Sequence, residues 1–557
     1  MFPVQIARLV SICHQKGIKK VVVSPGSRSA PLTIGFVRHG GFEVFTISDE
    51  RSAAYIALGM AQSSCQTVAL VCTSGTAVLN HAPAIAEAFY LQIPLLILSA
   101  DRPFEWIDQL DGQTIRQKNI HHLHTKGNFE IPSDSSHPDS IWLVDRTVNE
   151  AINLSNSQPF APVHINIPIR EPFYPKQNEI IDFEPIVPFE IKIFEEEKSN
   201  TFFSYQKWNQ LENEWNKFDK KLIVVGQNWA NEPWKTFLGK LQIPVVADVI
   251  ANYQALNAIT HQDLFSLDES LKPDLLITTG LSLISKNLKL FLRKHKPKAH
   301  WHIQESGYVA DTFQSLTKIL RINPNYFFEE VEKRRISCNP LYMGEWLKQE
   351  RKIKTSLSEW SKNFPFGELF VIQHLLKSLP ENSNLHLANS MAVRYVNLLG
   401  LPENAKFTIF SNRGTSGIDG SSSTSVGHCL SNPQKINILI TGDMAFFYDR
   451  NAFWHNYPLS NLKILLLNNH AGVIFRMIDA GQQPELEEYF ETHQTLEAEK
   501  TVQDFAMKYW KVKNENEFLE AFEEWLEEKN APCLLELITD KKESMKIYLD
   551  LKKFVMG

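Results

Sequence analysis

Short runs of apolar residues alternate with stretches of helical periodicity along most of this chain. Examples are KKVVVSPG at 19–26, TVALVCTS at 67–74 and PLLILSAD at 94–101, with the helical pattern SAAYIALGMAQ at 52–62 between the first two. Apolar runs of this kind, set between helices, are typical of strands buried on both faces of a parallel sheet. The pattern therefore predicts an α/β fold built from doubly wound parallel sheets.

The alternation divides into three blocks, which suits a chain of 557 residues at roughly 150 residues per domain. We expect domains at 1–175, 200–330 and 365–557. The polar, acidic stretch at 176–200 is typical of a linker, and the charged stretch at 328–362 of a helical connector. The predicted strands are 19–26, 42–48, 67–74, 94–101 and 162–168, then 221–227, 243–249, 274–280 and 299–304, then 384–390, 407–414, 436–443, 462–469 and 531–537.

Composition excludes several classes of protein. The chain has 57 Lys and Arg against 63 Asp and Glu, so its net charge of −6 disfavours a basic nucleic-acid binder. Its apolar runs fall short of the roughly 18 residues of a membrane span. Arg8 interrupts the apolar start, so no secretion signal is indicated. The six cysteines form no CxxC pair. We expect a cytoplasmic protein that binds neither nucleic acid nor membrane.

The third block contains the most specific pair of polar residues. One predicted strand ends at Asp443 and the next at Asn469, 26 positions later. The carboxyl ends of parallel strands share one edge of a sheet, where ligands bind. A carboxylate and an amide oxygen at that edge suit a hard cation such as Mg²⁺. Alternatively, Asp443 caps the following helix and Asn469 makes a turn.

A loop rich in glycine and serine, NRGTSGIDGSSSTSVGH at 412–428, leads into a helical pattern. Its backbone N–H groups, together with the positive end of the helix, could bind a phosphate. A flexible turn with a helix cap is the alternative.

In the first block, polar residues follow several predicted strands at one edge of the sheet. They are Ser27, Arg28, Glu50, Thr73, Arg102 and Gln113. Glu50 could instead be a favourable first-turn carboxylate of its helix. Each arginine, taken singly, could form a solvated salt bridge.

Together these residues resemble those of thiamine-diphosphate enzymes. The GDM at 442–444 with the NN at 468–469 resembles their metal–diphosphate motif, commonly GDG, and a first-domain glutamate is their other constant residue. Within that superfamily the chain most resembles the menaquinone-pathway family of 2-succinyl-5-enolpyruvyl-6-hydroxy-3-cyclohexene-1-carboxylate (SEPHCHC) synthases. The matching motifs, in order from about 24 to 475, are SPGSRSAPL, DER, TSGTAV, ADRP, GQTIRQ, PVHINIPIREPFY, NSMAVR, NRGTSGIDG, GDMAFFYDRNA and NNHAGVIF.

The resemblance implies pyrimidine-binding, central and diphosphate-binding domains, and a homodimer or homotetramer with active sites between subunits. Asp443, Asn469 and the carbonyl of Ala471, often glycine in the family, would hold Mg²⁺ or Mn²⁺. Glu50 would bind the aminopyrimidine of thiamine diphosphate and promote proton loss from the thiazolium. The other implied cofactor-binding residues are Thr73, Asn389, Ser390, Gly417, Ile418, Asp419, Gly442, Met444, Ala445, Gly472, Val473, Ile474 and Phe475.

The implied reaction decarboxylates 2-oxoglutarate and adds the succinyl unit to isochorismate. Both substrates are dicarboxylates, which planar guanidiniums clamp at two points. The implied clamps are Arg28, Arg102, Arg394 and Arg413, with Ser27, Gln113 and Ser390 as hydrogen-bonding partners. Lys286 would reach in from the central block, although Asn287 stands where the family often has arginine. Ile474 and Phe475 would form an apolar wall that excludes water.

Three alternatives stay open. Another thiamine-diphosphate decarboxylase or carboligase would share Glu50, Asp443 and Asn469 but need fewer basic residues. A binding scaffold that had lost its activity would be expected to lack Glu50 or the metal pair, and both are present. A phosphate-binding Rossmann protein would leave Glu50 without a role.

Overall fold

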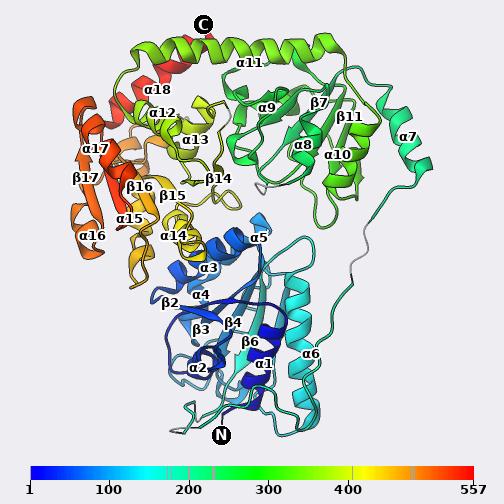
Figure 1. Ribbon diagram of the computed structural model, residues 1–557, viewed down its shortest axis with the longest axis vertical. Helices are drawn as coiled ribbons and strands as arrows, with labels where there is room; N and C mark the ends of the chain where they lie inside the picture. The colour runs from blue at the N-terminus through cyan, green and yellow to red at the C-terminus, as the bar shows by residue number, and fades with distance from the viewer. Residues whose placement is uncertain are drawn as a thin grey trace.

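A computed structural model describes residues 2–171, 173–176, 179–197, 201–228, 232–403, 405–477, 481 and 483–557. Within them the chain forms three six-stranded sheets, and every strand pair is parallel. The first sheet lies at one end of the molecule, and the other two lie side by side beyond it (Figure 1). The predicted α/β class with three parallel sheets is confirmed.

The first domain follows the predicted alternation. Its strands are β1 (Lys20–Val23), β2 (Glu43–Thr46), β3 (Val68–Cys72), β4 (Leu95–Asp101), β5 (Gly127–Glu130) and β6 (Val163–Pro168). Its helices are α1 (Val4–Gln15), α2 (Ala30–His39), α3 (Glu50–Ser64), α4 (Thr76–Asn80), α5 (Ala82–Leu91) and α6 (Pro138–Ser155). The strand order is β2-β1-β3-β4-β6-β5.

The central domain has a different order, β12-β11-β10-β7-β8-β9. Its strands are β7 (Lys221–Val225), β8 (Val245–Ala247), β9 (Ala258–Ile259), β10 (Leu275–Thr279), β11 (Ala299–Ile303) and β12 (Lys318–Leu320). Its helices are α7 (Tyr205–Trp215), α8 (Trp234–Leu238), α9 (Lys286–Lys294) and α10 (Pro324–Lys333). The long helix α11 (Pro340–Trp360) then crosses from the central to the third domain, as the charged connector predicted (Figure 1).

The third domain repeats the topology of the first, with the order β14-β13-β15-β16-β18-β17. Its strands are β13 (Asn384–Leu387), β14 (Thr408–Phe410), β15 (Asn437–Gly442), β16 (Leu462–Asn468), β17 (Lys508–Val512) and β18 (Cys533–Ile538). Its helices are α12 (Glu368–Ser378), α13 (Met391–Leu399), α14 (Ser421–Ser431), α15 (Asp443–Tyr448), α16 (Glu499–Asp504), α17 (Glu515–Glu527) and α18 (Lys541–Met556). None of the helices among the described residues is both long and apolar enough to cross a membrane.

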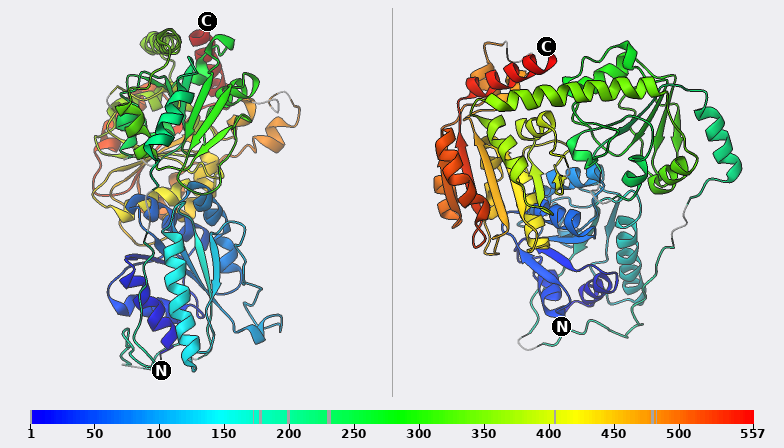
Figure 2. Two further views of the ribbon diagram at one scale, coloured as in Figure 1. Left: turned by 90° about the vertical axis from the view of Figure 1, so that its right-hand side faces the viewer. Right: turned by 45° about the horizontal axis from the view of Figure 1, so that its top comes forward.

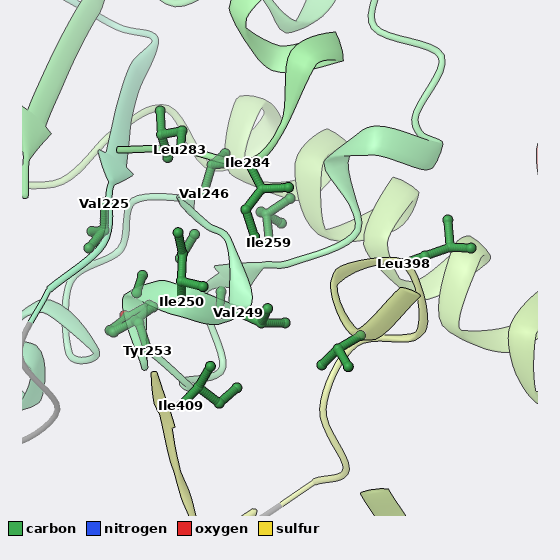
Figure 3. Packing of buried hydrophobic residues seen from close by; sticks show 14 of the residues in the cluster. Val225, Val246, Val249, Ile250, Tyr253, Ile259, Leu283, Ile284, Leu398 and Ile409 are labelled. Carbon is green, nitrogen blue, oxygen red and sulfur yellow. The ribbon is translucent and has the colours of Figure 1, made fainter. Parts of the chain in front are cut away.

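Buried side chains join the domains rather than stopping at their edges. One cluster runs from the central sheet into the third domain, where Leu398 and Ile409 meet central residues such as Val249 and Ile250 (Figure 3). A second cluster joins α3 of the first domain to α14 and the third sheet. Because burial of apolar area is the main favourable term in folding, these shared clusters fix how the domains sit.

Helices α3 and α14 cross at unusually short range (Figure 1). A Cβ added to Gly59 would lie 2.1 Å from the carbonyl oxygen of Thr424, and one added to Gly427 would lie 2.2 Å from that of Ile56. Only glycine allows backbones to approach this closely. The two glycines therefore set the distance between the first and third domains.

The stretch expected to be a linker packs along the first domain. Arg8, at 0% exposure, donates to the carbonyls of Pro185 and Phe189, and Lys16 donates to that of Phe194. Residues 172, 177–178 and 198–200, which belong to a predicted motif and to this stretch, lie outside the described residues. The acidic composition suggested a solvated linker, but isolated apolar side chains such as Ile181 and Ile191 anchor it to the first core.

Candidate active site

A cavity of about 580 Å³ lies at the carboxyl ends of β13, β15 and β16 in the third domain. Most predicted third-domain site residues line it: Asn389, Ser390, Arg394, Arg413, Ile418, Gly442, Asp443, Met444, Ala445, Asn469, Ala471, Gly472, Val473, Ile474 and Phe475. These residues are far apart in sequence, but they meet in the cavity because parallel strands end at one edge of the sheet. Ser390 has a φ of 72° at the turn from β13 into α13. Positive φ in a non-glycine residue is a strained conformation that is common at functional sites.

Asp443 and Asn469 both lie in the wall of this cavity. Asp443 is 2% exposed and accepts a hydrogen bond from Gln494 at 2.7 Å, and burial raises the pKa of its carboxyl to about 6. The side-chain N–H of Asn469 donates to Glu368 at 2.8 Å. Glu368, itself buried on α12, therefore fixes which way the amide of Asn469 faces. Sequence reasoning missed Glu368, because it stands at the start of a helix about 100 residues away, outside any motif.

Ala471 keeps an ordinary backbone conformation. The positive φ in this turn falls on His470, at 60°, rather than on Ala471. Alanine in place of the family's glycine therefore introduces no strain at the predicted carbonyl ligand.

The loop 412–420 is held mainly by Asn389. Its amide donates to the carbonyls of Asn412 at 2.7 Å and Gly417 at 2.6 Å, while Arg413 donates to its oxygen at 2.9 Å. Arg413 is 9% exposed, and its Nε has no hydrogen-bond partner within the described part of the chain. A buried donor without a partner costs stability unless a ligand satisfies it. The loop therefore presents Arg413 ready for an anion.

The start of α14 is partly capped by a residue of the chain itself, while the predicted role of the loop in phosphate binding stays a prediction. The start of α14 was predicted to offer its positive end to a phosphate, but Asp449 already accepts hydrogen bonds from the backbone N–H and the hydroxyl of Ser423, both at 2.7 Å. Because a carboxylate of the chain caps this helix, part of its dipole is satisfied internally. Asp419 also points elsewhere and accepts from Tyr55 of the first domain at 2.9 Å.

The predicted first-domain residues gather at a second edge, after β1, β3 and β4. Arg102 donates to Ser74 at 2.7 Å and pairs with Asp111 at 3.0 Å. Arg28, 8% exposed, donates to the carbonyl of Ile169. Burial and the neighbouring Arg102 lower the pKa of Arg28, which places the two guanidiniums close enough to repel. Two arginines held together in this way favour a bound anion.

The remaining predicted residues of the first domain belong to the same edge. A Cβ on Gly26 would lie 2.3 Å from that of Thr73, and one on Gly75 would lie 3.3 Å from the carbonyl oxygen of Gln113. Ser27 and Gln113 are exposed. Gln117, also missed, is 1% exposed and accepts from the N–H of Gly75 at 2.8 Å, so it fixes the loop after β3. Its only sequence signal was its place in the motif GQTIRQ.

Glu50 stands apart from the third-domain cavity. It is the first residue of α3, whose N-terminus Asp49 caps by accepting from the N–H groups of Arg51 and Ser52. Burial and the nearby Glu50 raise the pKa of Cys72, at the end of β3. Of the described residues that line the third-domain cavity, none belongs to the first domain. One chain therefore presents two separate halves of the predicted site.

No contact among the described residues places Lys286 beside either half of the predicted site. It is exposed at the start of α9, and Asn287 donates to the carbonyls of Gln262 and Phe265. Lys289, one turn further on, is half-buried and donates to the carbonyl of Leu283 at 2.7 Å. Burial lowers its pKa, Asp248 opposes that effect, and Arg413 adds to it. The central-domain lysine with an electrostatic link to the cavity is thus Lys289.

Comparison with known proteins agrees with this architecture. Residues 6–124 match the thiamine pyrophosphate enzyme N-terminal TPP binding domain, 194–387 the middle domain of thiamine pyrophosphate enzymes, and 393–537 the C-terminal TPP binding domain. The two TPP-binding matches fall on the two domains that share one strand order.

Full-length relatives are similar as well. The chain is 42% identical to a 2-succinyl-5-enolpyruvyl-6-hydroxy-3-cyclohexene-1-carboxylate synthase of Cytophaga hutchinsonii, over 98% of this chain and 97% of the relative. It is 38% identical to the synthase of Flavobacterium psychrophilum, over 98% of each, and 35% identical to that of Bacteroides thetaiotaomicron, over 98% of this chain and 97% of the relative. By these similarities over nearly its whole length, the chain belongs to the SEPHCHC synthase family of thiamine-diphosphate-dependent enzymes.

Proposed function

We propose that this chain decarboxylates 2-oxoglutarate with thiamine diphosphate and adds the succinyl unit to isochorismate, forming SEPHCHC for menaquinone biosynthesis. The observation that carries the proposal is the placement of four arginines: Arg394 and Arg413 line the same cavity, and Arg28 and Arg102 lie at one edge of the first domain. Burial and the neighbouring Arg394 lower the pKa of Arg413, as Arg102 does for Arg28. Each pair holds one buried guanidinium, Arg28 or Arg413, and one partly buried guanidinium, Arg102 or Arg394. Two such pairs suit two dicarboxylate substrates.

The residues present fit the cofactor and its metal. Asp443 is buried, and its carboxylate accepts a hydrogen bond from the neutral side chain of Gln494. Asp443, Asn469 and the carbonyl of Ala471 would supply three oxygen ligands, leaving the diphosphate to complete the shell of Mg²⁺ or Mn²⁺. Among the described residues, no group of three or more His, Cys, Asp or Glu is arranged so that it could hold a metal ion by itself. A site with one carboxylate favours a hard cation that shares its shell with phosphate.

When bound, thiamine diphosphate supplies the nucleophilic carbon that attacks a 2-oxo acid and accommodates the electrons left when CO₂ departs. Glu50 would hydrogen-bond the pyrimidine ring and share the proton that activates it. Ile474 and Phe475 line the cavity and would keep water from the reacting carbon. Ser27, Gln113 and Ser390 would donate to substrate oxygens, and Lys286 would contribute its ammonium group from the start of α9.

We infer that the working unit is at least a homodimer. Glu50 and the metal residues are both required by the chemistry, yet Glu50 does not line its own chain's cavity. A second copy that brings its first-domain edge against this cavity would complete the site. Exposed apolar side chains on the first domain, such as Phe104 and Leu110, are consistent with such a partner surface.

Product analysis tests the function directly. Purified protein with thiamine diphosphate, Mg²⁺, 2-oxoglutarate and isochorismate should give a product with the mass of SEPHCHC, and omission of any one component should abolish it. The second candidate, a generic 2-oxo-acid decarboxylase, is favoured only by the residues that all thiamine-diphosphate enzymes share. Release of CO₂ from pyruvate as fast as from 2-oxoglutarate would support it.

Different arginines should bind different substrates. Loss of one buried, charge-assisted contact costs a few kcal/mol, or about a hundredfold in kcat/KM for the substrate concerned. Among Arg28→Ala, Arg102→Ala, Arg394→Ala and Arg413→Ala, at least one should raise KM for isochorismate far more than for 2-oxoglutarate, and another should do the reverse. Paired KM measurements check this. Four variants with both values unchanged would contradict the dicarboxylate assignment.

A further inference from the structure

Glu87 is a buried carboxylate at the boundary between the first and third domains. It lies on α5, at the end of the first domain that faces the other two domains in the views of Figures 1 and 2. Its exposure is 1%. Burying a charge is costly unless its hydrogen bonds are satisfied. Such a group therefore needs an explanation beyond packing.

The partners of Glu87 all belong to the loop 412–420 of the third domain. Its Oε1 accepts from the N–H of Gly414 at 2.8 Å, and its Oε2 accepts from the N–H of Thr415 at 2.7 Å and from its hydroxyl at 2.6 Å. Gly414 and Thr415 directly follow Arg413. The carboxylate thus binds the backbone of the two residues that follow Arg413, whose guanidinium lines the cavity.

The loop also approaches α5 closely. A Cβ on Gly414 would lie 2.7 Å from the carbonyl oxygen of Glu87 and 3.1 Å from the Cβ of Tyr90. Asn389 holds the opposite side of Arg413 at 2.9 Å. Arg413 is therefore held by Asn389 of its own domain and, through the two residues that follow it, by Glu87 of the first domain.

Charge adds to this geometry. Burial and Arg394 lower the pKa of Arg413, whereas Asp248 and Glu87 raise it. The hydrogen bonds to Glu87 likewise oppose the rise in its own pKa that burial causes. The carboxylate therefore favours the charged form of a guanidinium that burial and a like charge disfavour.

We propose that Glu87 is a positioning residue for Arg413. It holds the loop 412–420 so that the guanidinium faces the cavity and can receive a substrate carboxylate. The binding of a substrate carboxylate by Arg413 rests on the proposed function, but the hydrogen bonds between Glu87 and the loop do not. Glu87 of the first domain would then hold the substrate-binding loop of its own chain. Glu50 of the same domain would bind a cofactor that another chain holds.

The variant Glu87→Gln separates positioning from general stability. The amide keeps the size of the side chain but turns N–H donors towards the donors of the loop. Hydrogen exchange of the peptide that contains Gly414 and Thr415 should accelerate about tenfold or more, because a buried N–H loses its acceptor. KM for the substrate that Arg413→Ala affects should rise about tenfold or more, with kcat within about threefold. Thr415→Val, which removes one of the three bonds, should move both readouts the same way by less.

Asp145→Asn is the matched control. Asp145 is a buried carboxylate of the same domain, and its bonds run to Arg8, away from the loop. This variant should lower thermal stability while the loop exchange and the KM values stay at wild-type levels. The proposal is overturned if Glu87→Gln changes loop exchange no more than Asp145→Asn does, or if exchange rises while both KM values stay unchanged. A wild-type protein that forms no product would contradict the proposed function instead, and the exchange measurement would still test the hydrogen bonds between Glu87 and the loop. If Glu87→Gln fails to fold, Thr415→Val with unaltered exchange overturns the proposal.

Discussion

Glu50, at the start of α3, is the residue that we propose shares a proton with the pyrimidine ring of the cofactor. Glu50→Gln keeps the size and a hydrogen-bonding oxygen but cannot share that proton. We expect thiamine diphosphate binding within about threefold of wild type, and a fall in kcat of about a hundredfold or more, since general acid–base catalysis typically contributes that much. Calorimetry and initial rates check the two halves of the expectation. Turnover near that of the wild type would remove Glu50 from the catalytic role.

Asp443 is the carboxylate of the predicted metal site. Asp443→Ala should weaken thiamine diphosphate and metal binding in parallel, because the cation would join the diphosphate to the protein. In the wild type, EDTA should lower cofactor affinity to a similar extent. Titration calorimetry in the presence and absence of EDTA measures both effects. If neither the substitution nor EDTA changed the affinity for thiamine diphosphate, the metal motif would have been misassigned.

Residues that follow strands were predictable, and residues that act through other residues were not. Asn389, Asp443 and Asn469 stand at strand ends, so the topology alone brings them to one cavity. Glu368 and Glu87 reach the site through contacts about 100 and 330 positions away in sequence. Such contacts depend on how domains pack, which local patterns do not encode. Lys286 stays a prediction from the motif alone, since no contact among the described residues places it beside either half of the site.

At the scale of elements, all predicted strands form, and the four that were missed share one property. β5, β9, β12 and β17 each lie at or next to a free edge of their sheets. An edge strand is covered on one side only, so it can be short and polar, as GNFE and KIL are. The apolar runs that reveal central strands are therefore absent. The shared strand order of the first and third domains is visible only in the hydrogen-bond ladders.

The crossing of α3 and α14 gives a test at this scale. Inside a helix, Gly→Ala normally stabilises by up to about 1 kcal/mol. At Gly59 the sign should reverse, because the new Cβ would meet the carbonyl of Thr424 at 2.1 Å, and overpacking costs about 1–3 kcal/mol. Gly344→Ala in α11 is the matched control, since its Cβ would meet nothing within 4 Å. Thermal unfolding should show Tm falling for Gly59→Ala and rising slightly for Gly344→Ala. Equal shifts for both would contradict the close crossing.

At the scale of the whole molecule, the first and third domains are two copies of one topology with complementary chemistry. The third carries the metal residues and the cavity, and the first carries Glu50 and a second arginine pair. Buried clusters lock these two domains together within one chain, through surfaces that leave Glu50 outside the cavity. We therefore propose that a working site joins the first domain of one subunit to the third domain of another.

Complementation between two inactive variants tests that claim most directly. Glu50→Gln and Asp443→Ala chains, each inactive alone, are co-expressed with different tags, and SEPHCHC formation is measured on the mixed species. A mixed dimer would hold one intact site of its two, with Glu50 from one chain and Asp443 from the other, so the purified mixed dimer should show about half of wild-type activity. If each site were built within a single chain, every chain in the mixture would carry one lesion. Activity no higher than that of the separate variants would then contradict the shared site.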